Sequence, residues 1–180
     1  MLRTLIALGA AALFITPAAA DDAKYTLDGE NTKLTFTGKK PNGKHDGGFK
    51  KLAGTVTVPD GDITKLTVAI DIETDSLFSD DNKLTGHLKT ADFFDVKNQP
   101  KATFKSTKIE KGDKTYTVTG ELTLLGKTKT VSFPATITAT GEALSVSASF
   151  TIDRTEWGMT YGKGKIDDKV AIGIAVTAKK

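Results

Sequence analysis

Hydrophobic and polar residues alternate along most of the chain, and this period of two is the dominant pattern. In the segment KLTVAIDIE, Leu66, Val68, Ile70 and Ile72 fall on one face, and YTVTGELTL and VSFPATITA behave in the same way. In LSVSASFTI, serine and threonine occupy the positions between the apolar residues. Such alternation is typical of antiparallel strands that bury one face and expose the other.

Shorter segments extend the pattern to eight or nine strands, separated by turn residues such as Pro59-Asp60-Gly61 and Lys111-Gly112-Asp113. The additional strands are KYTLD, KLTFTG, GTVTVP, ATFKST and KVAIGIAVTA. Many short strands with short connections predict an all-β sandwich or a closed antiparallel barrel. An outer-membrane barrel would carry aromatic girdles on its outer face, whereas aromatic residues are few here.

The long connection from Asp75 to Pro100 interrupts this rhythm. Within it, SDDNKLTGHLK predicts one short helix, with Ser79 or Asp80 as its N-cap. Phe93 and Phe94 follow, and we expect them to close one end of a barrel as a plug or lid. The alternative is that they cap the core without contacting a ligand.

The first twenty residues, MLRTLIALGAAALFITPAAA, have the features of a secretory signal peptide. They contain one early arginine, an apolar run and small residues before the expected cleavage after Ala20. We therefore expect a signal peptide at 1–20, one domain at 21–180 and a periplasmic location, without a membrane-spanning segment. The sequence has no cysteine, so packing and strand pairing must stabilise the exported domain without disulfides.

Charge and motifs exclude several classes of function. A formal net charge of only +3, with acids and bases interspersed, does not predict a nucleic-acid partner. His45 and His87 lack the spacing of a metal site, and no serine-hydrolase elbow or phosphate-binding loop is present. We expect His87 to make a polar contact near a barrel rim and His45 to lie in an exposed loop. No cofactor and no catalytic residue is predicted.

The inner faces are apolar nearly throughout, and about eight strands form a barrel that either fills itself or holds one small ligand. Small residues at the inward positions Gly120, Ala135, Ala139 and Ala148 favour a cavity, although they also serve close strand packing. A cavity of this kind would suit a long hydrocarbon chain, because each buried methylene contributes about 0.8 kcal/mol.

Four segments together resemble the YceI-like family. They are KLTFTGKKPNGKHDGGFKKLAGTV, LTGHLKTADFFDVKNQPKATFKST, GELTLLGKTKTVSFPATI and FTIDRTEWGM, in the order and spacing of that family. The resemblance implies an exported, lipocalin-like barrel of about eight strands that binds a polyisoprenoid or a related amphiphilic lipid. It also suggests a homodimer, which the residues themselves neither support nor exclude. The sequence departs from the commoner pattern just before His87, and this leaves the ligand's head group open.

The candidate ligand-binding residues are aromatic side chains on inward registers together with polar side chains near the ends of strands. They are Phe36, Phe49, His87, Phe93, Phe94, Phe104, Tyr116, Phe133, Phe150, Arg154, Trp157 and Tyr161. Arg154 and Trp157 have an alternative structural role, as a paired arginine and a barrel-corner tryptophan. Five lysines are expected in loops, where lysines at a rim would meet a pyrophosphate head group: Lys39, Lys40, Lys44, Lys163 and Lys165.

Three functional interpretations follow. The first is a periplasmic protein that binds, carries or sequesters a long-chain amphiphile without chemistry. The second is a lipid-modifying enzyme with His87 as general base, which predicts turnover that is lost in His87→Ala while binding remains. The third is a stress-related envelope protein whose filled barrel acts through protein contacts.

Overall fold

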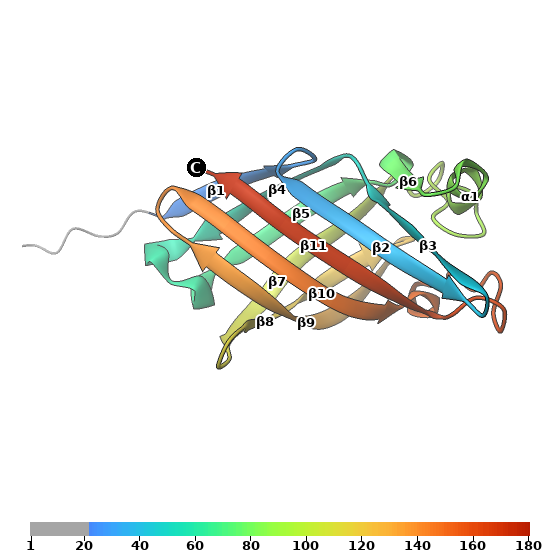
Figure 1. Cartoon of the computed structure of the whole chain (residues 1–180). Helices are drawn as coiled ribbons and strands as arrows, with labels where there is room; N and C mark the ends of the chain where they lie inside the picture. The colour runs from blue at the N-terminus through green and yellow to red at the C-terminus, as the bar shows by residue number, and fades with distance from the viewer. Residues whose placement is uncertain (1–21) are drawn as a thin grey trace, which may run out of the picture.

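The computed structural model describes residues 22–180, which form one curled antiparallel sheet (Figure 1). The predicted signal peptide and its cleavage site lie outside the described residues. The eleven strands are β1 (Ala23–Asp28), β2 (Thr32–Lys40), β3 (Gly43–Phe49), β4 (Leu52–Val58), β5 (Thr67–Glu73), β6 (Leu77–Ser79), β7 (Lys101–Lys111), β8 (Tyr116–Leu124), β9 (Lys127–Ala139), β10 (Ala143–Asp153) and β11 (Lys169–Lys179). Their order in the sheet is β1-β4-β5-β7-β8-β9-β10-β11-β2-β3-β6.

The all-β prediction with one short helix is confirmed, whereas a lipocalin-like barrel of about eight strands is not. The sheet contains eleven strands and curls into a half-barrel. Every strand expected from the alternation is present, and the two that were missed are β3 and β6. β6 has only three residues, Leu77–Ser79, and lies inside the long connection, where no alternation marks it.

Strand β3 was missed because its sequence, GKHDGGF, reads as a glycine-rich loop. It pairs with β2 from Leu34 opposite Phe49 to Lys40 opposite Gly43. Gly47 is required there, because an added Cβ would lie 2.5 Å from both the Phe36 ring and the Phe78 carbonyl oxygen. The glycine therefore marks close packing within a strand rather than a flexible loop.

The inner face of the sheet is packed tightly at one end and loosely at the other. Tyr25, Leu144 and Ala178 are at most 1% exposed and form the tight end. Ile172 and Ile174 share the inward register of Ala178 along β11 but are only half-buried. Since alternate positions on one strand point to the same face, the interior is filled near Ala178 and hollow further along.

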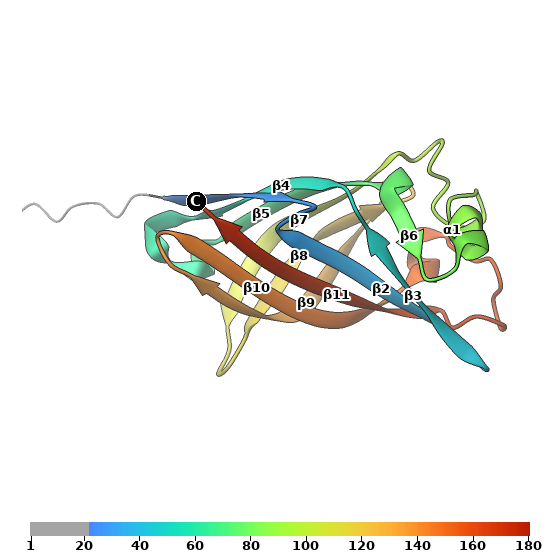
Figure 2. The same cartoon turned by 45° about the horizontal axis from the view of Figure 1, so that its top comes forward.

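Helix α1 (Asn82–Leu88) and the turns after it lie across the hollow end of the sheet (Figure 2). The helix is capped by Asp81, whose carboxylate accepts a hydrogen bond from the Leu84 N–H at 2.8 Å. The N-cap is thus one or two residues later than the predicted Ser79 or Asp80. Leu88 and Phe93 are buried in a small cluster of their own, separate from the main core.

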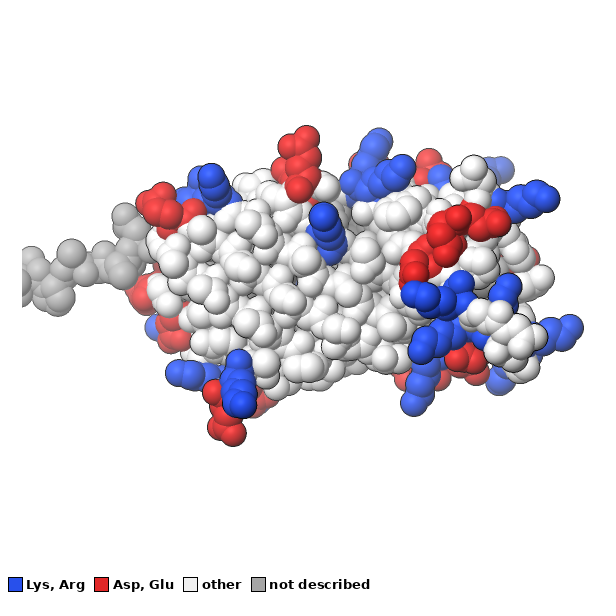
Figure 3. Space-filling model, in the orientation of Figure 1, with Lys and Arg blue, Asp and Glu red and all other residues white. Residues whose placement is uncertain are grey.

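The outer surface is unevenly charged. Figure 3 shows few charged side chains over β10, β11 and β2, and many at the ends of the molecule. Small side chains account for the uncharged face, since Ser145, Ser147 and Ser149 point outward from β10, and Gly173 and Ala175 point outward from β11. Among residues 22–180, no helix has the length and apolar character needed to cross a bilayer.

Candidate ligand cavity

A cavity of about 350 Å³ lies inside the curled sheet. Its wall is built from alternate positions of the long strands, among them Val68 and Ile70 of β5, Val146 of β10, and Ile172 and Ile174 of β11. Each of these apolar side chains points inward and is nevertheless only half-buried. The interior therefore leaves apolar surface uncovered, in the lower part of the size range of small-molecule sites.

Eight of the twelve predicted site residues line this cavity. They are Phe36, Phe49, Phe93, Phe94, Phe104, Phe133, Phe150 and Arg154. The rings of Phe133 and Phe150 stack with centroids 4.1 Å apart and planes at 6°, and Phe104 packs against Phe133 at 5.9 Å. These three rings form an aromatic wall across β7, β9 and β10.

Phe94 belongs to the segment that crosses the hollow end. Its ring packs edge-on against Phe49 at 5.5 Å and lies 6.4 Å from Phe36. Phe94 is half-buried and lines the cavity, whereas Phe93 is 6% exposed. Both rings thus line the cavity, and Phe93 is in addition buried in the small cluster with Leu77 and Leu88.

The remaining four predicted site residues do not line the cavity. Trp157 is 1% exposed and donates a hydrogen bond from Nε1 to the Leu122 carbonyl at 3.1 Å, so it has the structural position given as its alternative. Tyr116 packs against the main core. His87 and Tyr161 pack edge to face, 4.8 Å apart, and the Tyr161 side chain is 45% exposed.

Arg154 lines the cavity, but its guanidinium is fully occupied by the loop that follows. Nε donates to the Asp167 carbonyl at 3.1 Å, and Nη1 donates to the carbonyls of Met159 at 2.6 Å and Tyr161 at 2.9 Å. Nη2 reaches the Ile166 carbonyl at 3.5 Å and the Asp168 carboxylate at 3.2 Å. An arginine has five N–H donors, so none is left for a ligand. Arg154 shapes the loop at the rim.

Except for Thr32 and Thr35 of β2, the polar residues of the cavity lining lie together at the end covered by α1. Lys39 and Lys40 end β2, and Lys44 lies on β3 beside His45, so the expectation that these lysines lie in loops was wrong. The Asp167 N–H donates to the Lys39 carbonyl at 2.9 Å. His45 was predicted to lie in an exposed loop, and this was wrong, because it is a half-buried strand residue opposite Gly38. An apolar cavity with polar groups at one end matches an amphiphile.

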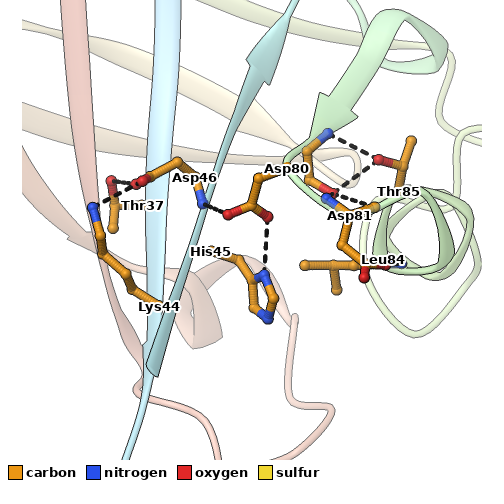
Figure 4. A network of polar contacts seen from close by, with 9 residues as sticks. Thr37, Lys44, His45, Asp46, Asp80, Asp81, Leu84 and Thr85 are labelled. Atoms are coloured by element: carbon orange, nitrogen blue, oxygen red, sulfur yellow. Dashed lines mark hydrogen bonds and ion pairs between the residues drawn. The ribbon is translucent and has the colours of Figure 1, made fainter. Parts of the chain in front are cut away.

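His45 is held by a network that joins β3 to the residues before α1 (Figure 4). Its Nδ1 lies 2.9 Å from one Asp80 carboxylate oxygen, and the other oxygen accepts the Asp46 N–H at 3.1 Å. The hydrogen bond from His45, followed by the one from the Asp46 N–H, holds the pKa of Asp80 below its ordinary value. Asp46 in turn accepts from Lys44 and Thr37, which also lower its pKa.

The described residues around the cavity offer no metal site. Within residues 22–180 no group of three or more histidine, aspartate or glutamate side chains is placed to hold a metal ion. His87 pairs with Asp92 at 2.8 Å on the lid segment, outside the cavity lining. The arrangement is thus that of an apolar binding cavity with a polar rim.

The model of the YceI-like domain matches residues 25–178. The chain belongs to the YceI-like family. Full-length relatives include a UPF0312 protein of Pseudomonas putida strain W619, which is 30% identical over 188 residues that cover 99% of this chain and 97% of the relative. A UPF0312 protein of Vibrio cholerae strain N16961 is 32% identical over 146 residues, which cover 79% of this chain and 77% of the relative.

Two solved structures support the YceI-like fold. BcnA of Burkholderia cenocepacia superposes with a TM-score of 0.72 at 28% identity, and the match covers 82% of this chain and 96% of BcnA. A polyisoprenoid binding domain from Saccharophagus degradans, implicated in plant cell wall breakdown, has a TM-score of 0.69 at 12% identity and covers 88% of this chain and 99% of that domain. At that identity the second likeness concerns the fold alone.

Most of the wall of this YceI-like cavity is aliphatic, whereas the residues predicted from the sequence to bind ligand were mainly aromatic. The aliphatic lining, such as Val146 and Ile172, was recognised only as inward-facing. His45 was also missed as a lining residue, although one signal existed. His45, Gly47 and Phe49 occupy alternate positions and so share a face, as in a strand.

Proposed function

We propose that this protein binds a long-chain amphiphile, with the hydrocarbon inside the curled sheet and the polar head at the rim near His45, and performs no chemistry on it. The observation that carries this proposal is the set of inward apolar side chains that remain half-buried around a cavity of about 350 Å³. A protein of this size ordinarily packs its interior to crystal-like density. Apolar surface left uncovered inside is therefore surface that a ligand can cover.

The energetics favour a hydrocarbon. Each methylene removed from water contributes about 0.8 kcal/mol, so some fifteen chain carbons supply on the order of 10 kcal/mol before the entropic costs of association. Contacts with the stacked Phe133 and Phe150 rings would add to this. The wall itself thus suffices for tight binding, and the rim is needed only to orient the head group.

A polyisoprenoid or a similar lipid is the cargo that we propose. Family membership supports a binding role, and the Saccharophagus degradans domain with the same fold is described as polyisoprenoid binding. We propose further that the protein works in the periplasm after removal of residues 1–20, and that it carries or sequesters the lipid there. Its association into a homodimer stays a prediction.

The two alternative functions are less well supported. The enzymatic interpretation relies on His87, but that imidazole is paired with Asp92 and does not line the cavity. The interpretation as a filled barrel conflicts with the hollow end near Ile172 and Ile174. Neither alternative explains why apolar side chains on the inner face remain uncovered.

The first test is native mass spectrometry of the mature protein purified from its cell envelope, followed by organic extraction of whatever is released. A stoichiometric isoprenoid or fatty amphiphile is the expected result. A mass that stays ligand-free after incubation with a panel of such lipids would instead support a filled interior and contradict the proposal.

A pair of neighbouring substitutions tests the location of the cargo. Val146→Phe adds bulk to the cavity wall, whereas Ser147→Phe adds the same bulk to the exposed outer face. We expect the first to abolish lipid binding and the second to leave it unchanged, with both proteins folded by Trp157 fluorescence. Equal binding by both variants would place the lipid elsewhere.

A further inference from the structure

His45 differs from the other polar side chains of the cavity lining in that it is held in one orientation. Lys39, Lys40 and Asp167 are exposed side chains, and among the described ion pairs none involves them. The His45 ring, by contrast, is anchored at Nδ1 by Asp80, whose second oxygen is itself held by the Asp46 N–H. A pre-oriented group of this kind is what gives a binding site its specificity.

The anchor also decides what the second ring nitrogen can do. An ionised carboxylate only accepts hydrogen bonds, so Nδ1 must donate its proton to Asp80. In a neutral imidazole the other nitrogen, Nε2, is then an acceptor. Figure 4 shows Nε2 on the side of the ring turned away from Asp80. Gly38, opposite His45 in the β2–β3 hairpin, has no neighbour within 4 Å of the place where a Cβ would be, so there is open space beside the ring.

The hydrogen-bonding character of this nitrogen argues against an anionic partner. Asp46, the next residue along β3, points to the opposite face and pairs with Lys44 at 2.8 Å, so the carboxylate that contacts the ring is that of Asp80. Neutral Nε2 accepts hydrogen bonds, and a fully ionised phosphate has no proton to donate to it, so an anionic head would have to bind Lys39 and Lys40 of the lining instead. A hydroxyl group has no such restriction, and it donates to neutral Nε2 or accepts from protonated Nε2 with equal ease.

We propose that His45, oriented by Asp80, is the head-group site of the cavity and that it selects amphiphiles with an uncharged, hydroxyl-bearing head. This rests on the proposed function, since it names the head group of the cargo whose chain fills the cavity. Asp80 acts here as a positioning residue. Because Asp80 also lies directly before the helix cap Asp81, the same contact ties the head-group site to the segment that covers it.

The test compares three ligands with one hydrocarbon chain: farnesol, farnesyl methyl ether and farnesyl pyrophosphate. Their affinities are measured by displacement of the fluorescent apolar probe phenylnaphthylamine. We expect the alcohol to bind roughly two- to tenfold more tightly than the ether, the gain of one net hydrogen bond. Tighter binding of the pyrophosphate than of the alcohol would overturn the assignment in favour of the rim lysines.

Substitutions of the two histidines test whether the preference for the alcohol arises at His45. In His45→Phe the alcohol should fall to the affinity of the ether, while the ether itself is unchanged and so reports an intact cavity. The matched control is His87→Phe, because His87 also pairs with an aspartate at 2.8 Å and is equally exposed, yet lies outside the lining. An alcohol preference that survives in His45→Phe, or disappears in His87→Phe, would contradict the proposal.

A second His45 variant and an NMR measurement separate loss of the head-group contact from collapse of the cavity. If His45→Phe binds neither ligand because its cavity has collapsed, His45→Ala, which removes the ring without adding bulk, is compared with the wild type in the same way. For Asp80→Ala, NMR of the ring nitrogens should show that the single Nδ1–H tautomer of His45 is lost; an unchanged tautomer would remove Asp80 from the site. Failure of all three ligands to bind the wild type would refute the proposed function, whereas equal affinities would refute only the role of His45.

Discussion

Replacement of Arg154 should open the loop at the cavity rim, and the size of the effect follows from its hydrogen bonds. Four of the five contacts are 2.6–3.2 Å long, and the fifth is at 3.5 Å. At a net contribution of about 1 kcal/mol for each good bond, Arg154→Met should lower the free energy of unfolding by about 4 kcal/mol.

Arg154→Lys tests the hydrogen-bond geometry separately from the charge, because lysine keeps the positive charge but lacks the planar arrangement of N–H donors. A lysine has three donors on one nitrogen and cannot reach carbonyls that surround a planar guanidinium. We expect it to restore one or two contacts and to cost about 2–3 kcal/mol. Asp168→Asn should cost less than about 1 kcal/mol, because that carboxylate is partly exposed and makes only one of the contacts.

Urea unfolding followed by the fluorescence of Trp157, the single tryptophan of the chain, measures these differences. Trypsin cleavage after Lys163 and Lys165, which are exposed in the same loop, reports whether the loop opens before the sheet unfolds. An Arg154→Lys variant with the unfolding midpoint and the cleavage rate of the wild type would show that the guanidinium hydrogen bonds do not stabilise the loop at the cavity rim.

Two further predictions concern acid sensitivity and the lid. The Thr155 hydroxyl and then its backbone N–H lower the pKa of Asp153 in the folded state, so the stabilisation is present above the unfolded pKa of about 4 and is lost as the pH falls through the folded pKa. Urea midpoints should therefore drop in acid, and less so in Asp153→Asn; an equal drop in both would refute this. Phe94→Ala should speed the release of bound lipid, measured by stopped-flow transfer to vesicles. It should lower the free energy of unfolding by less than the loss of about 3–5 kcal/mol expected for a fully buried phenylalanine. Unchanged release would show that the ring does not seal the cavity.

The alternation of residues predicted the strands well because it is a local property. Val146 and Ile172 share a face with their neighbours whatever the rest of the chain does, and both lie where the pattern placed them. The alternation does not determine how much space remains between the side chains that face each other inside the curled sheet. The small residue Gly120 favours a cavity when only the sequence is considered, but the Phe104 ring occupies that place, 2.5 Å from where a Cβ would be. The glycine packs an aromatic ring, and the hollow lies further along.

The head-group site depends on pairings that no local pattern carries. His45 and Asp80 are 35 positions apart, and they meet because β3 pairs with β6 just before α1. The sequence alone predicts His45 in an exposed loop and Asp80 as a possible helix N-cap, and nothing in it indicates that the two side chains meet. For Arg154 and Trp157 the sequence did suggest a structural role as an alternative. Only the structure shows that the Arg154 guanidinium donates its hydrogen bonds to carbonyls of the loop that follows it.

The place of β11 in the sheet also determines how the molecule must assemble. β11 lies between β10 and β2, and it joins Thr35 to Gly173 across 138 positions. Closing so long a loop is entropically costly, and such non-local pairing slows folding. Until β11 docks, β10 and β2 each present an unpaired edge that invites pairing with another chain. The yield of refolded protein is therefore governed by competition between docking of this one strand and aggregation, more than by the stability of the finished sheet.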